Sequence, residues 1–409
     1  MRVTRGLRRR EPPPDRGEEV SQIIGAVRRG GDSAVLELTE RFDHAELGPD
    51  ELRVDPRELE GSVGVLEPKL LEALRTAIAN VRAVAEAQLR EPVTFEGAQG
   101  QRIEIAELPV QRAGVYVPGG RAPYLSTVVM GAVTAGVAGV PQVAVCAPPG
   151  PGGRAHPAIL AACVLCGVSE VYRMGGAQAV AAMAYGTQSV KAVDVIVGPG
   201  NAWVTEAKRQ VFGIVGIDGL AGPSELVVIA GSDAEPEVVA LDLLAQAEHG
   251  SDSLVGLIAM DERVLADVVG AVERMGPERP SVTEAELQVL RVDDPVAALR
   301  AAEEFAPEHL QLVGADAEGL AHRVRSAGAV FVGAGSGTAF GDYVAGSNHV
   351  LPTGGAARFG SALSVSTFRR RMARVSLPGD APARLAPAGA ALARAEGFPV
   401  HAESMERRA

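Results

Sequence analysis

The stretch AGVYVPGG, residues 113–120, has the pattern of a short buried strand that ends in a tight turn. Its apolar residues run up to Val117, and proline and glycine then end the strand. Short apolar strands that alternate with helices are typical of βαβ units on a parallel sheet. Three further segments repeat the pattern: QVAVCAPPG (142–150), EVYRMGG (170–176) and VDVIVGPGN (193–201).

A second series of apolar strands follows in the last half of the chain. Together the two series predict two α/β domains with parallel sheets, which divide near LAGPSE at residues 220–225. Residues 16–42 and 65–90 have the apolar spacing of amphipathic helices. The strands of the second series are SELVVIAG (224–231), SLVGLIAM (253–260), LQVLRV (287–292), HLQLVGA (309–315) and AVFVGAG (329–335).

Composition excludes several classes of protein. The net charge of −12 disfavours binding to the phosphates of nucleic acids. Three cysteines are too few for a disulfide framework and indicate a reducing compartment. The arginine-rich N-terminus lacks the apolar core of a signal peptide, and glycine and proline interrupt the uncharged stretch 122–153. We therefore expect a cytoplasmic protein that binds neither nucleic acid nor a membrane.

Three polar residues follow strands of the first series: Tyr116, Gln178 and Asn201. In open α/β sheets, ligands bind beyond the carboxyl ends of the strands, where helix N-termini favour phosphate oxygens. A dinucleotide could lie across these three positions. The common G-x-G-x-x-G pattern is absent, however, and ordinary tight turns explain the glycines equally well.

The second series presents a different set of polar residues. Gln246 and His249 are three positions apart, which would place them on one face of a helix. A glycine-rich stretch after the last strand carries Asp342 and His349. Such side chains suit a borderline metal such as zinc. The alternative is that Gln246 and His249 merely cap the end of a helix, where a cationic histidine is favourable.

Glu308 and His309 are adjacent at the start of a predicted strand. A carboxylate beside an imidazole provides two bases of different strength, which stepwise proton transfers need. The alternative is that they are two polar residues that begin a strand and take no part in chemistry.

These residues lie within motifs that resemble histidinol dehydrogenases. The resemblance extends from about residue 16 to the end of the chain and includes the tail AEGFPVHAES, which contains Glu396 and His401. One departure is the loop SGTAF (336–340), which lacks the acidic residue that family members often have there. The other motifs, in chain order, are YVPGG, GGAQA, GPGNAWVTEAKRQV, AGPSE, LLAQAEHG, PEHL and GDYVAGSNHVLPT.

The resemblance implies a role for each of these residues. Zinc, one ion per subunit, would be bound by Gln246, His249, Asp342 and a histidine of the partner subunit's C-terminal arm, which corresponds to His401. NAD would contact Tyr116, Gln178 and Asn201. The catalytic bases would be Glu308 and His309. The substrate would contact Ser224, His309 and Glu396 together with the zinc ligands Gln246, His249, Asp342 and His401.

The resemblance also implies a fold of two incomplete Rossmann-like, aldehyde-dehydrogenase-like domains with small terminal extensions. We expect a homodimer in which each C-terminal arm completes the partner's active site. The expected units are an N-terminal extension (1–15), a zinc domain (16–114 and 224–363), an NAD domain (115–223) and the arm (364–409).

The expected reaction is the four-electron oxidation of L-histidinol to L-histidine through L-histidinal, with two NAD, at the end of histidine biosynthesis. One alternative is a related NAD-dependent dehydrogenase that acts on another polar alcohol, such as a sulfonated diol. Another is a metal-binding protein without a nucleotide. The presence of Glu308, His309 and the three expected NAD contacts argues against the latter.

Overall fold

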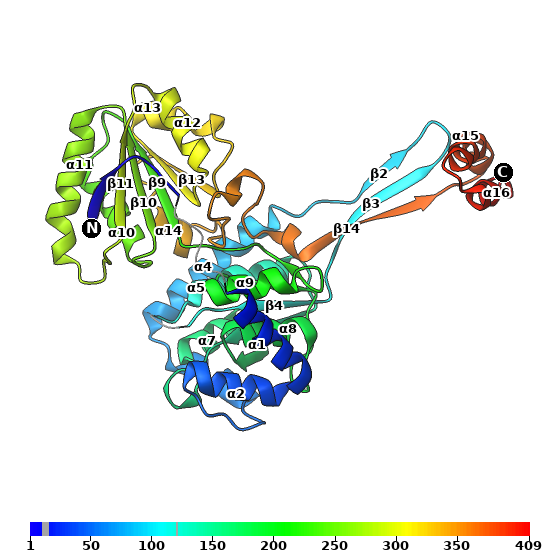
Figure 1. Cartoon of the computed structure of the whole chain (residues 1–409), viewed down its shortest axis with the longest axis horizontal. Helices are drawn as coiled ribbons and strands as arrows, with labels where there is room; N and C mark the ends of the chain where they lie inside the picture. The colour runs from blue at the N-terminus through cyan, green and yellow to red at the C-terminus, as the bar shows by residue number, and fades with distance from the viewer. Residues whose placement is uncertain (10–15, 120–121) are drawn as a thin grey trace.

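The computed structural model describes residues 1–9, 16–119 and 122–409, and its strands form three separate sheets (Figure 1). A five-stranded sheet has the order β6-β5-β4-β7-β8, and all its strands are parallel. The four segments of the first series form four of its strands, as predicted. The strands are β4 (Arg112–Tyr116), β5 (Gln142–Ala147), β6 (Glu170–Arg173), β7 (Val195–Val197) and β8 (Gly216–Ile217).

Helices follow the strands of this sheet in the βαβ manner expected from the sequence. Their bounds are α5 (Leu125–Val128), a π-helical turn (Val129–Val133), α6 (Thr134–Val137), α7 (Pro157–Leu165), α8 (Gly176–Tyr185) and α9 (Ala202–Val211). Helices α7 and α8 are rich in alanine and mostly buried, which lets them pack closely on the sheet.

The N-terminal helices pack on this same unit. Val20 and Ile24 share a hydrophobic core with Met183 of α8, and Leu74 and Val81 share one with Val115 of β4. The structure therefore differs from the predicted grouping of 16–114 with 224–363, because the apolar faces of these helices cover the five-stranded sheet. The helices are α1 (Gly17–Gly30), α2 (Asp32–Asp43), α3 (Pro56–Gly61) and α4 (Pro68–Glu86).

A six-stranded parallel sheet contains all five strands of the second series. Its order is β1-β11-β10-β9-β12-β13. The strands are β1 (Arg2–Arg5), β9 (Glu225–Ala230), β10 (Leu254–Ala259), β11 (Glu286–Arg291), β12 (His309–Val313) and β13 (Ala329–Val332). The helices of this unit are α10 (Pro236–Ala247), α11 (Glu262–Met275), α12 (Pro295–Phe305), α13 (Ala315–Glu318) and α14 (Thr338–Tyr343).

The first residues of the chain are not a separate extension. Strand β1 pairs with β11 along the edge of the six-stranded sheet, so residues 2–5 belong to that unit. The expected extension 1–15 also includes residues 10–15, which lie outside the described residues. In the sequence, RVTR is too short and too polar to stand out as a strand.

The C-terminal arm projects away from both α/β units (Figure 1). Its stem is a three-stranded antiparallel sheet of β14 (Arg369–Ser376), β3 (Arg102–Pro109) and β2 (Val93–Glu96). Residues 93–109 therefore contribute to the arm, which the sequence placed only in 364–409. Helices α15 (Ala381–Ala395) and α16 (Pro399–Glu406) pack together at its tip.

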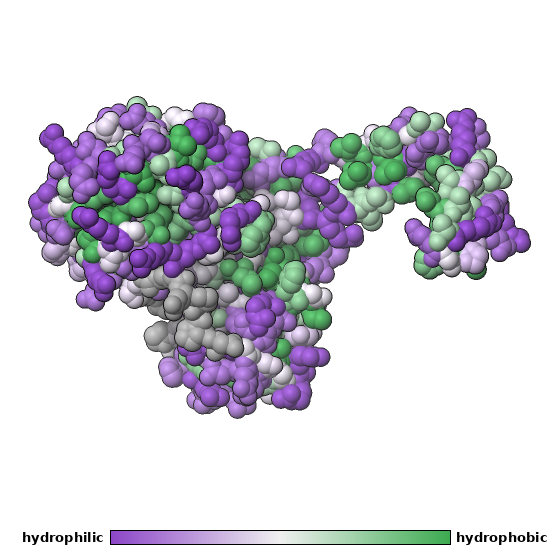
Figure 2. Space-filling model, turned by 45° about the horizontal axis from the view of Figure 1, so that its top comes forward, coloured by the Kyte–Doolittle hydropathy of each residue, from purple (hydrophilic) through white to green (hydrophobic). Residues whose placement is uncertain are grey.

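The arm exposes many apolar side chains, and Figure 2 shows hydrophobic surface along it. Exposed apolar patches of this kind mark interaction surfaces. The exposed residues include Val93, Phe95, Val375, Leu392, Phe398 and Val400. In the described part of the chain, no helix is both long and apolar enough to cross a membrane.

Candidate active site

A cavity of about 910 Å³ is lined by residues of both α/β units. The segment that connects the two sheets leads into strand β9. Its last residue, Ser224, lies in the cavity wall. The cavity brings together most of the polar residues singled out from the sequence. They are Asn201 from the five-stranded unit and Ser224, His249, Glu308, His309, Asp342 and His349 from the segments of the other unit.

Glu308 and His309 lie side by side at one wall of this cavity, and both are almost completely buried. The Glu308 carboxylate accepts hydrogen bonds through Oε2 from Ser224 Oγ at 2.7 Å and from the Glu225 backbone N–H at 2.8 Å. His309 Nδ1 lies 3.0 Å from the Glu225 carbonyl oxygen. Because a carbonyl only accepts, Nδ1 carries a proton, and Nε2 is left to face the cavity.

Neighbouring carboxylates control the protonation of His309. Burial lowers its pKa, but the charges of Glu308 and Asp342 outweigh burial and raise the pKa of His309 to about 9. Nε2 lies 3.7 Å from Asp342 Oδ1. Burial and the charge of Glu308 likewise raise the pKa of Glu225, directly behind the pair, to about 7. The site therefore concentrates negative charge around one imidazole.

Asp342 lies between two histidines. Its Oδ2 atom is 3.9 Å from His249 Nε2, on the side away from His309. Burial raises the pKa of Asp342, but His309, His349 and His249 lower it below its usual value. His349 is partly buried, and its Nδ1 donates to the Asp342 carbonyl at 2.9 Å. Asp342 is thus kept as a carboxylate.

Zinc fits the side chains that meet here. Two ligand atoms of one tetrahedral zinc ion lie about 3.4 Å apart, close to the separation of His249 and Asp342. Gln246 donates through Nε2 to Ser224 Oγ at 2.9 Å, which leaves its oxygen for a metal. Residues 1–9, 16–119 and 122–409 contain no cluster of three His, Cys, Asp or Glu suited to a metal. Zinc would therefore need Gln246 and one further side chain.

The last turn of α10 places these ligands differently from the sequence expectation. The helix ends at Ala247, so His249 follows the helix instead of lying on its face. The His249 backbone N–H still bonds to the Gln246 carbonyl at 3.3 Å, which keeps the two residues close. Gly250 then turns the chain with a φ of 154°.

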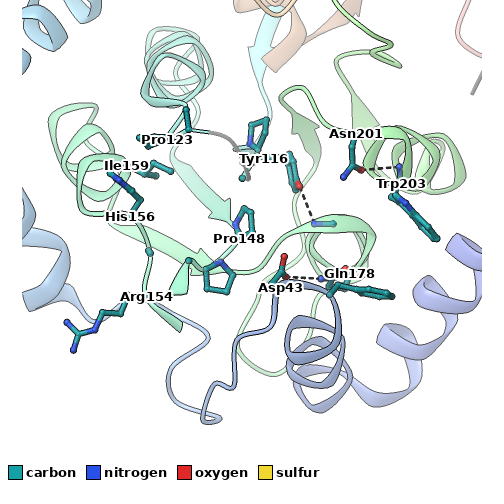
Figure 3. A pocket seen from close by; sticks show the side chains of 18 of the residues that line it. Asp43, Tyr116, Pro123, Pro148, Arg154, His156, Ile159, Gln178, Asn201 and Trp203 are labelled. Atoms are coloured by element: carbon teal, nitrogen blue, oxygen red, sulfur yellow. Dashed lines mark hydrogen bonds between the residues drawn. The ribbon is translucent and has the colours of Figure 1, made fainter. Parts of the chain in front are cut away.

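A second cavity of about 880 Å³ lies at the carboxyl ends of the five-stranded sheet (Figure 3). The three expected cofactor contacts, Tyr116, Gln178 and Asn201, all line it. Tyr116 accepts from the Gly176 N–H at 3.1 Å, and Asn201 caps the N-terminus of α9. Because Asn201 and Pro118 also line the first cavity, the two cavities adjoin.

Asp43, which the sequence analysis missed, also lies in this second cavity. It accepts a hydrogen bond from Gln178 Nε2 at 3.4 Å (Figure 3). Burial raises the pKa of Asp43 to about 6, although His44 opposes the shift. No motif marks Asp43 in the sequence, since it is the last residue of an ordinary amphipathic helix.

The turn that carries Asn201 is fixed by buried groups. Gly198 has a φ of 116°, and a Cβ there would lie 2.1 Å from the Tyr116 carbonyl oxygen, so the position requires glycine. The buried ammonium of Lys208 donates to the Gly198 carbonyl at 3.0 Å and pairs with Asp218. Asp218 in turn accepts from the Gly198 N–H at 2.7 Å. Lys208 thus has a structural role.

Two other residues of the predicted site lie elsewhere in the chain. Glu396 follows the last residue of α15, and His401 is in α16, at the tip of the arm (Figure 1). The arm extends away from the cavities of its own chain. The structure of one chain therefore does not bring Glu396 and His401 to Asp342 and His249.

The family model described as histidinol dehydrogenase matches residues 8–409. The chain belongs to the histidinol dehydrogenase family. It is 45% identical over 399 residues to histidinol dehydrogenase of a Synechococcus species. The aligned region covers 96% of this chain and 92% of that protein. It is 43% identical over 409 residues to histidinol dehydrogenase of Zymomonas mobilis, and the aligned region covers 98% of this chain and 94% of that protein.

The fold agrees with the same family. The crystal structure of histidinol dehydrogenase from Elizabethkingia anophelis superposes with a TM-score of 0.94 at 32% identity. The match covers 100% of this chain and 98% of that one. The predicted family, the α/β fold and the assignment as an oxidoreductase are thereby confirmed. The roles of the individual site residues stay predictions.

Proposed function

We propose that the chain is a zinc-dependent L-histidinol:NAD oxidoreductase. It would oxidise L-histidinol through L-histidinal to L-histidine with two NAD, at the end of histidine biosynthesis in the cytoplasm. The observation that supports this best is the adjacency of the two cavities through Pro118 and Asn201. NAD in the cavity of Tyr116 and Gln178 would reach the wall that carries Glu308 and His309.

Substrate orientation depends on the group around Asp342. Gln246, His249, Asp342 and His401 of the partner subunit would hold zinc. When bound, zinc would supply a fixed point for the imidazole and amino nitrogens of the substrate, which lowers the entropic cost of reaction. Ser224 lies beside Gln246 and Glu308, where its hydroxyl can contact the same substrate.

His309 is the proposed base for the two hydride transfers. Its Nε2 would take the hydroxyl proton of the alcohol as hydride leaves the adjoining carbon for NAD. The carbonyl of Glu225 fixes the ring by holding Nδ1–H. Since Glu308 and Asp342 raise the pKa of His309, the neutral base is favoured under alkaline conditions.

Glu308 is the proposed base for the step between the two hydride transfers. Its carboxylate would take a proton from water as that water attacks the aldehyde carbon. The resulting gem-diol would lose hydride in the second oxidation, again with His309 as base. Two donors, Ser224 Oγ and the Glu225 N–H, fix the carboxylate for this purpose.

The active site would be completed by dimerisation. The arm extends from its own chain and exposes apolar surface, as an exchanged element must. Glu396 and His401 would then contact substrate and zinc in the partner's cavity. Without a partner, one chain would supply only three of the four proposed zinc ligands: His249 and Asp342 in the cavity wall and Gln246 beside Ser224.

The test is NADH formation from L-histidinol, with and without a chelator. We expect NADH to appear, to stop after chelation and to return when zinc is added. Activity on another polar alcohol but none on L-histidinol would contradict the proposal. A chelator without effect would contradict the zinc dependence alone.

A further inference from the structure

Glu225 holds both proposed bases although it lies behind them. Its backbone N–H donates to Glu308 Oε2, and its carbonyl accepts from His309 Nδ1. Its side chain adds two more contacts. Oε2 accepts from the Glu308 N–H at 3.3 Å, and Oε1 accepts from the Gly354 N–H at 3.2 Å. Glu225 is 5% exposed and does not line either cavity.

The backbone that Glu225 holds is strained. Ala306, directly before Pro307 and Glu308, has a φ of 48° and a ψ of 67°. This left-handed conformation is costly for a residue with a Cβ. Such strain persists only where surrounding contacts enforce it. The hydrogen bond from the Glu308 N–H to Glu225 is one of these contacts.

The second side-chain contact reaches another wall of the catalytic cavity. Gly354 follows Thr353, whose hydroxyl oxygen accepts a hydrogen bond from the Gly222 N–H. Thr353, Gly354 and Gly222 all line the cavity, together with Ser224 and Glu308. The buried Glu225 carboxylate thus connects the turn that carries Glu308 to the loop that carries Gly354. The two N–H groups contact different oxygens of Glu225, so a side chain with a single acceptor oxygen in the same place would lose one of these two contacts.

We propose that Glu225 is a positioning residue for Glu308. Its carboxylate holds the strained turn and the Gly354 loop so that the Glu308 carboxylate stays aimed at the water that attacks the aldehyde. The inference rests on the proposed function, which it extends by one residue. His309 is less dependent on this side chain, because its contact with Glu225 uses the backbone carbonyl, which any substitution keeps.

The test compares Glu225→Gln with Glu308→Gln. L-histidinol and L-histidinal are supplied separately with NAD. The rate of the first hydride transfer is taken from a single turnover of L-histidinol, and kcat and KM are measured for L-histidinal. Glutamine keeps the size of Glu225 but offers one acceptor in place of two. We expect kcat for L-histidinal to fall by about 10–100-fold, since misplacing a reacting group by about 1 Å has effects of this size. KM and zinc content should stay within about 3-fold.

The oxidation step that a variant slows is more informative than the size of the loss in rate. Glu225→Gln should affect the same step as Glu308→Gln, and by less. Asp242→Asn is the control: Asp242 is a partly buried carboxylate of the same unit that accepts a hydrogen bond from Gln311 and not from the catalytic pair. We expect Asp242→Asn to leave the ratio of the first hydride transfer rate to kcat for L-histidinal unchanged.

If Glu225→Gln does not fold, Glu225→Asp is used instead. Aspartate keeps the charge and both acceptors but is shorter by one methylene, so it should give the same selective loss. Unchanged kinetics, or equal losses in both steps, would overturn the proposal. If the wild-type protein does not oxidise L-histidinol, the proposed function fails. If it does and Glu225→Gln matches it, only this inference fails.

Discussion

Nε2 of His309 lies 3.7 Å from Oδ1 of Asp342, so the proposed base and a proposed zinc ligand are neighbours. The opposite oxygen of Asp342 faces His249. In the proposed function, this carboxylate would connect proton transfer to metal binding. A substrate oriented at the metal would place its hydroxyl group next to His309, which is the arrangement that general-base catalysis requires.

The two bases should be separable by mutation. His309→Asn should lower the rate of both oxidations by roughly 10²–10⁴-fold, since it removes the base that both hydride transfers use. Glu308→Gln should mainly lower L-histidinal oxidation, because water attack occurs only there. Single-turnover measurements with each substrate provide the rates. Selective damage to alcohol oxidation by Glu308→Gln would contradict this division.

The three cysteines should be dispensable for the chemistry. Burial raises the pKa of Cys146, Cys163 and Cys166, so a nucleophilic thiolate is disfavoured at each position. A folded variant with all three changed to alanine should retain its turnover and still release the acid. Product analysis is the measurement. Release of L-histidinal as the main product would support a thiol mechanism instead.

Asp43→Asn should change how stability depends on pH. Burial raises the pKa of Asp43 from its usual value to about 6 in the folded protein. The contribution of Asp43 to stability is therefore fully present below the unfolded pKa and is lost as the pH rises through 6. The Tm of Asp43→Asn relative to wild type should thus increase between pH 4 and pH 7.

Asp218→Asn provides a contrast, because Asp218 has a cationic partner in Lys208. Removing that charge leaves a buried ammonium without its counter-charge, which is destabilising. The Tm of Asp218→Asn should therefore be lower than that of the wild type at pH 7.

For Asp43, the contradicting result is the same Tm difference between Asp43→Asn and wild type at pH 4 and pH 7. Burial would then not control the ionisation of Asp43.

The sequence predicted the parallel strands well because their signals are local. Apolar runs such as that of β4 end in proline or glycine, and the pattern repeats. Strands β1 and β2 were not predicted, because each has only four residues and none of them is buried. The packing of α1 and α2 was assigned to the wrong unit because an amphipathic face does not specify which sheet it covers.

The site was predicted only where motifs mark it. Tyr116, Asn201, His309 and Asp342 lie in recognisable segments, and the structure places all four on the two adjoining cavities. Asp43 and the side-chain contacts of Glu225 depend on tertiary packing, which no local pattern encodes. The left-handed Ala306 also escaped, since alanine gives no signal for such a conformation.

The exchanged arm can be tested with two inactive variants. Asp342→Ala damages the cavity and His401→Ala damages the arm. If each arm serves the partner, a mixed dimer contains one site with both lesions and one intact site. Mixing and reassociation should therefore restore part of the activity. No recovery, with mixed dimers shown to form, would contradict arm exchange.

The central claim is a complete four-electron oxidation at one site, and the stoichiometry of the reaction tests it most directly. The protein is incubated with limiting L-histidinol and excess NAD, and NADH and L-histidine are both quantified at completion. The account predicts two NADH and one L-histidine for each L-histidinol consumed. One NADH for each L-histidinol, with L-histidinal as the final product, would contradict it.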